Sequence, residues 1–341
     1  MIVDLRSDVL TKPTPEMVRA MNEAVSKLGD DVYGEDPFIN ALQEKVAKLL
    51  GKEAALFVAS GTMANQLAIA AQTKPRDEII LDSNSHIFQF EQGAHAVISG
   101  VQTRPIPFED GLPSEKAIEN ALRFPDIHYP SSRLLCLEVT HALSGGTVPD
   151  YGRFKAICIK AHSLGLKIHL DGARIWNAVV ASGRGIRDFT GFVDTVMFSF
   201  TKGLGAPVGA ILAGPAEVIR YANYIRKGIG GGWHKAGVLA AAAMYALDNH
   251  VERLKEDHAR TQRLAEAISA NQNLELIGRV DTNIVFFRPK KMDIVSYSDR
   301  LTEKGVLHEW RHFKNMIRLV VHNGISDEMI DYAISAMGSI S

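Results

Sequence analysis

The sequence predicts an α/β fold, with a mostly parallel central sheet in a large domain and a smaller α+β domain at the C-terminal end. Between about residue 54 and 200, short apolar runs alternate with amphipathic helical segments, the pattern of parallel strands joined by crossover helices. At 341 residues the chain is too long for one small core. Beyond residue 240 the alternation gives way to a different pattern. We therefore expect domains at residues 1–240 and 241–341.

Strands of the large domain are predicted where apolar residues form short runs, at 54–58, 78–81, 134–140, 166–170 and 195–200. The strand at 166–170 is the clearest, because the helix before it carries an apolar stripe and stops at Gly165. That stripe consists of Phe154, Ile157, Cys158 and Ala161. A further strand at 208–212 follows 195–200 too closely for a crossover helix, so it should be antiparallel.

The C-terminal part begins with a long amphipathic helix whose apolar stripe includes Leu247, Val251, Leu254, Leu264 and Ile268. Strands are then predicted at 283–287 and 316–321, followed by a closing helix at 326–337. Together these elements indicate a small α+β domain.

Composition and charge exclude several classes of function. The formal net charge is −1, and the longest basic cluster is Pro289-Lys290-Lys291, so neither a nucleic-acid surface nor a membrane patch is expected. Cys136 and Cys158 lie in apolar stretches and should be reduced core residues. The charged N-terminus does not resemble a signal peptide, and no stretch reaches the ~20 apolar residues of a membrane span. A cytoplasmic protein acting on a small molecule is the expectation.

Chemically useful residues follow the predicted strands, at the sheet edge where open parallel sheets bind ligands. Lys202 comes between an apolar strand and Gly203, where a desolvated lysine could lose its proton and form a Schiff base with a carbonyl. Asp171 ends the preceding strand, where a carboxylate can keep a pyridine nitrogen protonated. Taken alone, Lys202 is more often a solvated loop lysine, and Asp171 is more often part of an Asp-Gly turn or a helix cap.

Two further segments lie at the same edge. Ser60-Gly61-Thr62 joins a strand to an alanine-rich helix, so its backbone amides and the helix dipole suit a phosphate, although an ordinary helix cap has the same pattern. A nucleotide is less favoured, because the chain has no Walker A lysine and no G-x-G-x-x-G. His86 could stack on a flat cofactor or move protons, or it could simply be hydrogen-bonded.

The segment His308-Glu309-Trp310-Arg311-His312 matches the H-E-x-x-H pattern of zinc hydrolases. The two histidines bind zinc only when a helix puts them on one face. Because Gly305 and Val306-Leu307 precede the motif and a strand follows at Met316, we expect a connection between strands and no metal site. A zinc hydrolase is kept as a remote alternative.

Taken together, these residues resemble the threonine aldolase family, pyridoxal 5'-phosphate (PLP) enzymes with the aspartate aminotransferase-like fold, called fold type I. The resemblance covers nearly the whole chain, and the order and spacing of its motifs are more specific than any one of them. The motifs are Asp4-Leu5-Arg6-Ser7-Asp8, Lys12-Pro13-Thr14, Gly29 to Pro37, Ser60-Gly61-Thr62-Met63, Ser85-His86-Ile87, Asp171-Gly172-Ala173-Arg174, Lys202-Gly203-Leu204, Ala206-Pro207-Val208-Gly209 and Ile317-Arg318-Leu319-Val320.

The resemblance implies a role for each candidate residue. Lys202 would form the Schiff base with the cofactor, Asp171 would pair with the pyridine nitrogen, and His86 would stack over the ring. Gly61 and Thr62 would hold the phosphate. The substrate carboxylate would bind Ser7, Arg174 and Arg318, of which Arg174 would also lie at the cofactor, since a guanidinium fork suits a carboxylate. His128 would lie near the substrate hydroxyl, and either His86 or His128 would be the catalytic base.

Such enzymes complete their sites with neighbouring subunits, so a homo-oligomer, a tetramer or a dimer, is expected. The first 20 or so residues would then pack on the small domain or on a neighbouring subunit. The implied reaction cleaves a β-hydroxy-α-amino acid, of the L-threonine or L-allo-threonine type, to glycine and an aldehyde. An amino-acid racemase or a β-eliminating lyase could use the same residues, and a non-catalytic PLP carrier is a further alternative.

This chain departs from the family pattern in three places. Val139 and Ala142 replace two asparagines in Glu138-Val139-Thr140-His141-Ala142. In Gly230-Gly231-Gly232-Trp233-His234-Lys235 the usual phosphate-binding arginine is missing, so His234 or Lys235 would have to substitute. The segment 308–315 is bulkier than usual and leads directly into Arg318. We expect that segment to alter substrate choice or reaction outcome.

Overall fold

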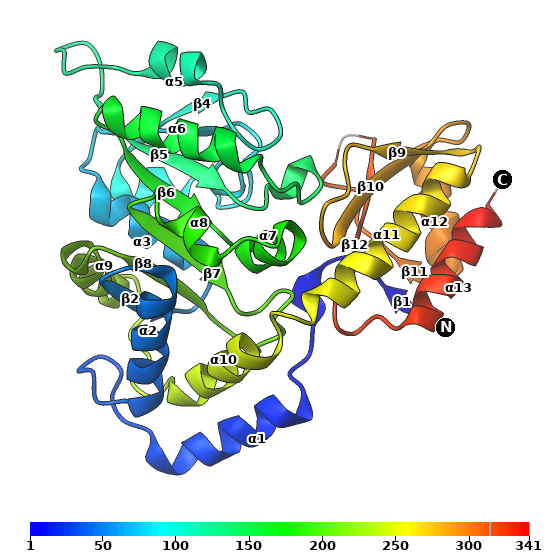
Figure 1. Ribbon diagram of the computed structural model, residues 1–341, viewed down its shortest axis with the longest axis horizontal. Coiled ribbons are helices and arrows are strands. Elements are labelled where there is room, and N and C mark those ends of the chain that lie inside the picture. Colours follow the sequence, from blue (N-terminus) through cyan, green and yellow to red (C-terminus); the bar gives the residue numbers. More distant parts are fainter. Residues whose placement is uncertain (314, 341) are drawn as a thin grey trace.

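The computed structural model describes residues 1–313 and 315–340, which form a large lobe and a smaller one (Figure 1). The large lobe contains a seven-stranded sheet in the order β2-β8-β7-β6-β5-β3-β4. Its strands are β2 (Ala54–Val58), β3 (Glu78–Asp82), β4 (Gln102–Ile106), β5 (Ser132–Glu138), β6 (Lys167–Asp171), β7 (Thr195–Ser199) and β8 (Ala210–Gly214).

The neighbouring strands β4, β3, β5, β6 and β7 pair in parallel, and β8 is antiparallel to both β7 and β2. The predicted α/β class is therefore confirmed, as is the antiparallel strand near 208–212. The five strands predicted between 54 and 200 are all present, with ends shifted by two residues or fewer. β4 was not predicted.

Helices cover both faces of this sheet, and alternate strand residues face the two layers. Val196 and Phe198 of β7 belong to the main core, whereas Met197 between them packs in a second cluster with α3 and α9. Strands buried on both faces read as continuous apolar runs, which is why the sequence predicted them. The helices are α2 (Pro37–Leu50), α3 (Gly61–Gln72), α5 (Glu115–Ala121), α6 (Tyr151–Ser163), α7 (Ile175–Ser182), α8 (Ile186–Thr190) and α9 (Ala216–Gly228).

The small lobe has an antiparallel sheet in the order β12-β10-β9, with its own hydrophobic core. Its elements are α11 (Leu254–Ala270), β9 (Leu274–Ile277), β10 (Ile284–Pro289), α12 (Ile294–Glu303), β11 (Val306–Leu307), β12 (Ile317–Val320) and α13 (Asp327–Gly338). The N-terminal strand β1 (Val3–Asp4) pairs in parallel with β11, so the blue start of the chain lies in the orange and red lobe (Figure 1). The domain boundary near 240 stays a prediction.

The single long helix predicted after residue 240 was wrong. The chain forms two helices instead, α10 (Gly237–Asn249) and α11, separated by a turn at 250–253. The ring N–H of His250 donates to the carbonyl of Leu204 at 2.8 Å, which holds the turn against the large lobe. Leu247 packs in the core of the large lobe, whereas Leu264 and Ile268 pack in the core of the small lobe. The apolar residues that were predicted to line one helix therefore belong to two separate cores.

The remaining elements are short or lie at the periphery. Helix α1 (Pro15–Ala24) lies along α10 beneath the large lobe (Figure 1). Short helical turns occur at α4 (His86–Gln89), Asp8–Leu10, Val25–Lys27, His95–Ser99 and Ala142–Ser144. Among the helices that the structure describes, none combines the length and apolar character needed to cross a bilayer.

Candidate active site

Lys202 and Asp171 lie just beyond or at the carboxyl ends of the neighbouring parallel strands β7 and β6. The loop that carries Lys202 is held from outside the sheet, because the hydroxyl of Thr11 donates to the carbonyls of Thr201 at 3.2 Å and Lys202 at 3.3 Å. The chain then turns at Gly205, whose φ of 76° favours glycine. The lysine is thus fixed at the sheet edge where open α/β sheets bind ligands.

The amine of Lys202 is poised to react as a nucleophile. Burial and the nearby Arg174 guanidinium lower its pKa to about 8, although the carboxylates of Asp8, Asp171 and Glu138 act in the opposite direction. An amine attacks a carbonyl only in its neutral form, and a lowered pKa raises the neutral fraction at physiological pH. The location and electrostatics of this side chain therefore suit Schiff-base formation.

Asp171 is ionised despite being only 2% exposed. Burial would raise its pKa, but the charges of His86 and Lys202 and hydrogen bonds from Asn65 and the amide of Ala173 outweigh burial and lower it. Those bonds measure 2.8 Å from Asn65 Nδ2 and 3.0 Å from the amide of Ala173. A buried carboxylate whose pKa is lowered is the partner that a protonated pyridine nitrogen requires.

His86 opens α4, directly after the turn that follows β3. Its backbone N–H donates to Glu138 Oε2 at 2.8 Å, and its ring Nδ1 lies 2.8 Å from Glu91 Oε1. Burial would lower the pKa of His86, but the bond to Glu91 and the charge of Asp171 prevail and raise it above the ordinary value. The imidazole is therefore oriented by a carboxylate and lies within the electrostatic field of Asp171.

Glu91 and Asn65 join this site, and the sequence did not point to either as a functional residue. Asn65 lies one turn into α3 after Gly61, so its place in the Ser60-Gly61-Thr62 motif was an available indication. Glu91 follows α4, and its spacing from His86 has no helical or strand period that could have revealed it. His86, Glu91 and Asp171 offer ligand atoms within 4.8 Å of one another, a possible cation site, but these atoms already hydrogen-bond within the protein.

The N-terminus of α3 provides the candidate phosphate site. Ser60 caps the helix, its hydroxyl accepting from the amide of Met63 at 3.1 Å. Gly61 and Thr62 are the first helical residues, whose amides have no partner inside a helix. A Cβ on Gly61 would lie 2.7 Å from the Cε atom of Met197, so this backbone packs closely on β7. The free amides and the helix dipole suit a phosphate group.

The predicted carboxylate-binding residues gather around the N-terminal segment. Arg174 donates from Nε and Nη2 to the two oxygens of Asp8, both at 2.7 Å, and Asn283 Nδ2 also donates to Asp8. Asp8 is fully buried, and the Arg174 charge holds its pKa well below its usual range. The Nε and Nη2 donors of Arg174 are therefore already used by Asp8. Ser7 caps the turn that contains Asp8.

Arg318, by contrast, has unused capacity for an anion. Its Nη2 donates to the carbonyl of Arg6 at 3.1 Å, while its Nε is buried without a hydrogen-bond partner. Its guanidinium lies 4.8 Å from the ring centroid of Phe313. Burial and the nearby Arg174 charge lower the pKa of Arg318 to about 10. An anion bound to the Arg318 guanidinium would accept a hydrogen bond from Nε and would neutralise the buried positive charge.

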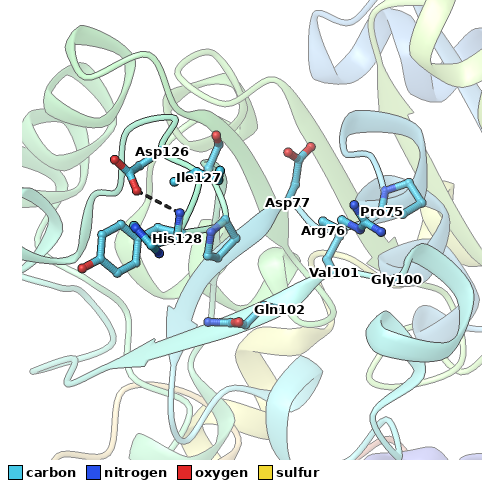
Figure 2. Close-up of a pocket in the computed structure, with 12 residues that line it drawn as sticks. Pro75, Arg76, Asp77, Gly100, Val101, Gln102, Asp126, Ile127 and His128 are labelled. Atoms are coloured by element: carbon cyan, nitrogen blue, oxygen red, sulfur yellow. Dashed lines mark hydrogen bonds between the residues drawn. The ribbon is translucent and has the colours of Figure 1, made fainter.

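His128 does not join the other candidates within one chain. It is exposed and lines a cavity of about 640 Å³ together with residues 75–77, which precede β3, and residues 100–102 at the start of β4 (Figure 2). These segments are at the amino ends of the parallel strands, whereas Lys202 and Asp171 are at the carboxyl ends. In this chain His128 therefore cannot act beside Lys202, and a catalytic role would need the histidine of another subunit.

The departures from the family pattern have clear structural places. Val139 is fully buried and its amide donates to the carbonyl of Asp171, while Ala142 supplies a backbone amide to Glu138. His141 is buried beside Asp82, Nε2 to Oδ2 3.0 Å. The ring of His234 pairs with Asp30 at 3.0 Å and is half exposed. The substitution of His234 or Lys235 for the missing arginine stays a prediction.

The zinc motif does not form the helix that it requires. The residues after β11 make an isolated bridge at Glu309 and a turn, and Lys314 lies outside the described residues. His308 is buried, with Nε2 2.5 Å from Ser298 Oγ and Nδ1 3.0 Å from the carbonyl of Val306. Both ring nitrogens thus have structural partners. Phe313 places its ring centroid 4.8 Å from the guanidinium of Arg318, and the backbone of Glu309 pairs with that of Arg318.

Known proteins match this chain throughout. A family model described as "Beta-eliminating lyase" matches residues 4–291. The low-specificity L-threonine aldolase 1 of Arabidopsis thaliana is 38% identical over 341 residues, 98% of this chain and 94% of that protein. The low specificity L-threonine aldolase of Escherichia coli K12 is 38% identical over 332 residues, 96% of each. A threonine aldolase structure from Leishmania major has a TM-score of 0.86 at 19% identity, covering 98% of both chains.

The last of these comparisons shows the shared fold, and the first three show the family. The family assignment is consistent with the geometry of the site. The buried lysine, the ionised aspartate on the next strand and the capped helix all lie at one edge of the sheet. The predicted family resemblance, fold type and enzyme class are confirmed: the chain belongs to the β-eliminating lyase family, and it is a PLP-dependent lyase related to the threonine aldolases.

Proposed function

We propose that this enzyme cleaves a β-hydroxy-α-amino acid, of the L-threonine or L-allo-threonine type, to glycine and an aldehyde. The observation that carries the proposal is the pairing of a lysine whose pKa is lowered to about 8 with a buried, ionised aspartate on the next strand. The identity to threonine aldolases over nearly the whole chain supports the same reaction.

The residues present fit pyridoxal 5'-phosphate. Lys202 would hold its aldehyde carbon, Asp171 its pyridine nitrogen, and the amides of Gly61 and Thr62 its phosphate. When bound, the cofactor supplies an electron sink for the electron pair of the broken bond. His86 would lie against its ring, an assignment supported by the charge interaction of His86 with both Asp171 and Lys202.

Arg318 binds the substrate carboxylate, with Ser7 beside it. The unpartnered Nε of Arg318 and its lowered pKa support this role, because a carboxylate would satisfy the buried donor and neutralise the charge. Arg174, whose Nε and Nη2 are held by Asp8, contributes its positive charge and its remaining nitrogen. Holding the carboxylate fixes which bond at Cα is aligned for cleavage, so this contribution is mainly geometric.

His86 is the better placed of the two predicted bases, since His128 lies at the opposite edge of the sheet. It takes the proton of the substrate β-hydroxyl while the Cα–Cβ bond breaks and the aldehyde carbonyl forms.

Product analysis separates this function from its alternatives. Purified holoenzyme is incubated with L-threonine, L-allo-threonine and L-serine, and the products are identified by chromatography. Glycine with acetaldehyde supports the proposal. An inverted amino acid would instead identify a racemase, and a 2-oxo acid with ammonia a β-eliminating lyase. If none of the three substrates is converted, the proposal is refuted, and a non-catalytic PLP carrier is the remaining alternative.

We further propose a homo-oligomer, a tetramer or a dimer, in the cytoplasm. Exposed apolar side chains on the loop that carries His128 support association: Phe124 is 71% exposed, Ile127 95% and Tyr129 57%. The free, buried thiols of Cys136 and Cys158 agree with a reducing compartment. Light scattering coupled to gel filtration tests the first part, since a strictly monomeric protein would contradict it.

A further inference from the structure

A buried carboxylate lies behind His86, and its surroundings determine how the histidine is protonated. Glu91 is 3% exposed and accepts hydrogen bonds from Asn65 Nδ2 at 2.8 Å, from Gln66 Nε2 at 2.5 Å and from His86 Nδ1 at 2.8 Å. Both oxygens of this carboxylate accept from amide N–H groups, so it is the acceptor toward the histidine as well, and His86 carries its proton on Nδ1. When His86 is neutral, its lone pair is therefore on Nε2.

Asn65 donates from Nδ2 to Asp171, an ionised carboxylate that only accepts, so its Oδ1 faces a second histidine. Burial lowers the pKa of His169 to about 4, so its ring is neutral and has one N–H. Its Nε2 lies 3.0 Å from Asn65 Oδ1 and its Nδ1 lies 2.9 Å from Thr195 Oγ1. Because an amide oxygen only accepts, Nε2 carries the proton, and Nδ1 accepts from the hydroxyl of Thr195.

Thr195 is held in that orientation, since its oxygen accepts from Gln72 Nε2 at 2.8 Å. Asn65 Nδ2 thus donates to both carboxylates, Glu91 Oε1 and Asp171 Oδ2, each at 2.8 Å. One amide therefore fixes the acid behind His86 relative to the acid assigned to the pyridine nitrogen. The network has one consistent set of donors and acceptors.

We propose that Glu91 is a positioning residue that holds His86 as the Nδ1–H form, leaving Nε2 as the atom that takes the β-hydroxyl proton, with Asn65 tying Glu91 to Asp171. This inference rests on the proposed function. The proton moves from the hydroxyl oxygen to Nε2 as the Cα–Cβ bond breaks and the aldehyde carbonyl forms, and bound PLP would supply the electron sink for the pair of that bond. His86 becomes an imidazolium whose Nδ1–H stays on Glu91, the arrangement that a general base needs for stabilisation.

The charges that face His86 come from four elements: Glu91 after α4, Asp171 on β6, Lys202 after β7 and, at the backbone amide, Glu138 on β5. Burial and Lys202 lower the pKa of His86, whereas Glu91 and Asp171 raise it, and the net change is upward. Replacing Glu91 by a neutral isostere removes one raising contribution while Asp171 stays. The pKa of His86 should therefore fall.

The test compares E91Q holoenzyme with wild type and with E78Q as a matched control. Glu78 is also fully buried and hydrogen-bonded, but it starts β3 at the opposite edge of the sheet, near Ser132 and Arg123. We expect E91Q to lower kcat for glycine release from L-threonine by about 10- to 100-fold, less than the ~100- to 10,000-fold that a whole general base contributes, because His86 itself remains. Its acid limb in the pH profile should move to lower pH, whereas that of E78Q should not.

A lower plateau with an unmoved acid limb would show that Glu91 is only structural and would overturn the proposal. Two further measurements cover other cases. In an H86F background E91Q should have no additional effect on kcat, since a positioning residue acts through its partner. If E91Q does not fold, E91D replaces it, and partial retention of kcat with the wild-type acid limb is expected.

The proposed function can fail independently. If wild-type enzyme releases no glycine, the reaction assignment is wrong, and the state of His86 is then read directly from ¹⁵N chemical shifts of labelled holoenzyme, assigned by loss of the signal in H86F. A neutral ring with its proton on Nδ1 supports the geometry. A proton on Nε2 with Nδ1 unprotonated would overturn it, because Glu91 would then have no donor at that position.

Discussion

The neutral form of the Lys202 amine should be populated at physiological pH, and the extent can be worked out from its pKa. At pH 7 an amine with a pKa of about 8 is ~9% neutral, whereas one at the ordinary value of 10.5 is ~0.03% neutral. The difference is about 300-fold in the reactive form. Burial is the main cause of this shift and the Arg174 charge the second.

Competitive labelling of the apo-enzyme measures this pKa. A trace amount of acetic anhydride is added at a series of pH values, and mass spectrometry of the peptides gives the relative acetylation of Lys202. The exposed Lys116 on α5, in the same digest, corrects for hydrolysis of the reagent. Acetylation of Lys202 should rise tenfold per pH unit up to about 8 and then level off, because the neutral form is then fully populated.

The same experiment on R174Q gives the sign of the second contribution. Removing the guanidinium takes away a charge that lowers the pKa and frees the Asp8 carboxylate, which raises it. The plateau should therefore begin at higher pH than in the wild type. Labelling of wild-type Lys202 that keeps rising beyond pH 10 would refute the electrostatic argument, since it would mean that the amine is solvated.

Other substitutions test the substrate site and the scaffold. R318K should raise KM for the amino acid by about 10- to 100-fold with little loss of PLP, because a charge-assisted bond contributes ~1.5–3 kcal/mol; an unchanged KM would place the carboxylate elsewhere. F313L should raise KM about fivefold with kcat retained, since a cation–π contact contributes ~1 kcal/mol, and H312A is the control on the same segment. G209A should lower the free energy of unfolding by at least ~2 kcal/mol in urea titrations, because φ is 115° and its Cβ would lie 2.5 Å from the Phe57 ring; a stable variant would contradict that packing.

The strands that hold the site were predictable because they are buried on both faces. The edge strand β4, which is not, was not predicted. Val196 to Phe198 is apolar throughout, since β7 is covered by two helical layers. The edge strand β4 is polar, partly exposed and includes Pro105, which a central strand would not tolerate. Its sequence therefore resembles a loop, and only pairing with β3 defines it as a strand.

Residues at strand ends were predictable as a group, whereas their partners were not. Lys202, Asp171 and His86 follow apolar runs, so their common location at one edge follows from parallel topology. Glu91 reaches the same site through a loop whose path depends on tertiary packing. His128 was assigned by resemblance alone, and its loop is at the other edge of the sheet in this chain. No local pattern distinguishes a residue that serves its own subunit from one that serves a neighbour.

The segment before Arg318 includes buried side chains, which limits how its influence on the substrate can be tested. Alanine substitution of His308, Trp310 and His312 would be a direct test of whether this segment influences substrate choice. His308, however, is buried against Ser298, and Trp310 packs on the small-lobe core, so both changes would perturb folding. Phe313 is the side chain in contact with the Arg318 guanidinium. The hypothesis that this segment affects the substrate is therefore best tested at Phe313.

The most direct test of the account is the visible absorption spectrum of the purified enzyme with and without Lys202. Wild-type protein should show a band near the edge of the visible range that borohydride reduction removes, leaving a mass increase on the peptide that contains Lys202. K202A, with circular dichroism and oligomeric state unchanged, should lack the reducible band and all glycine release. A K202A variant that retains both, or a label found on another lysine, would contradict the assignment of this amine as the cofactor's attachment point.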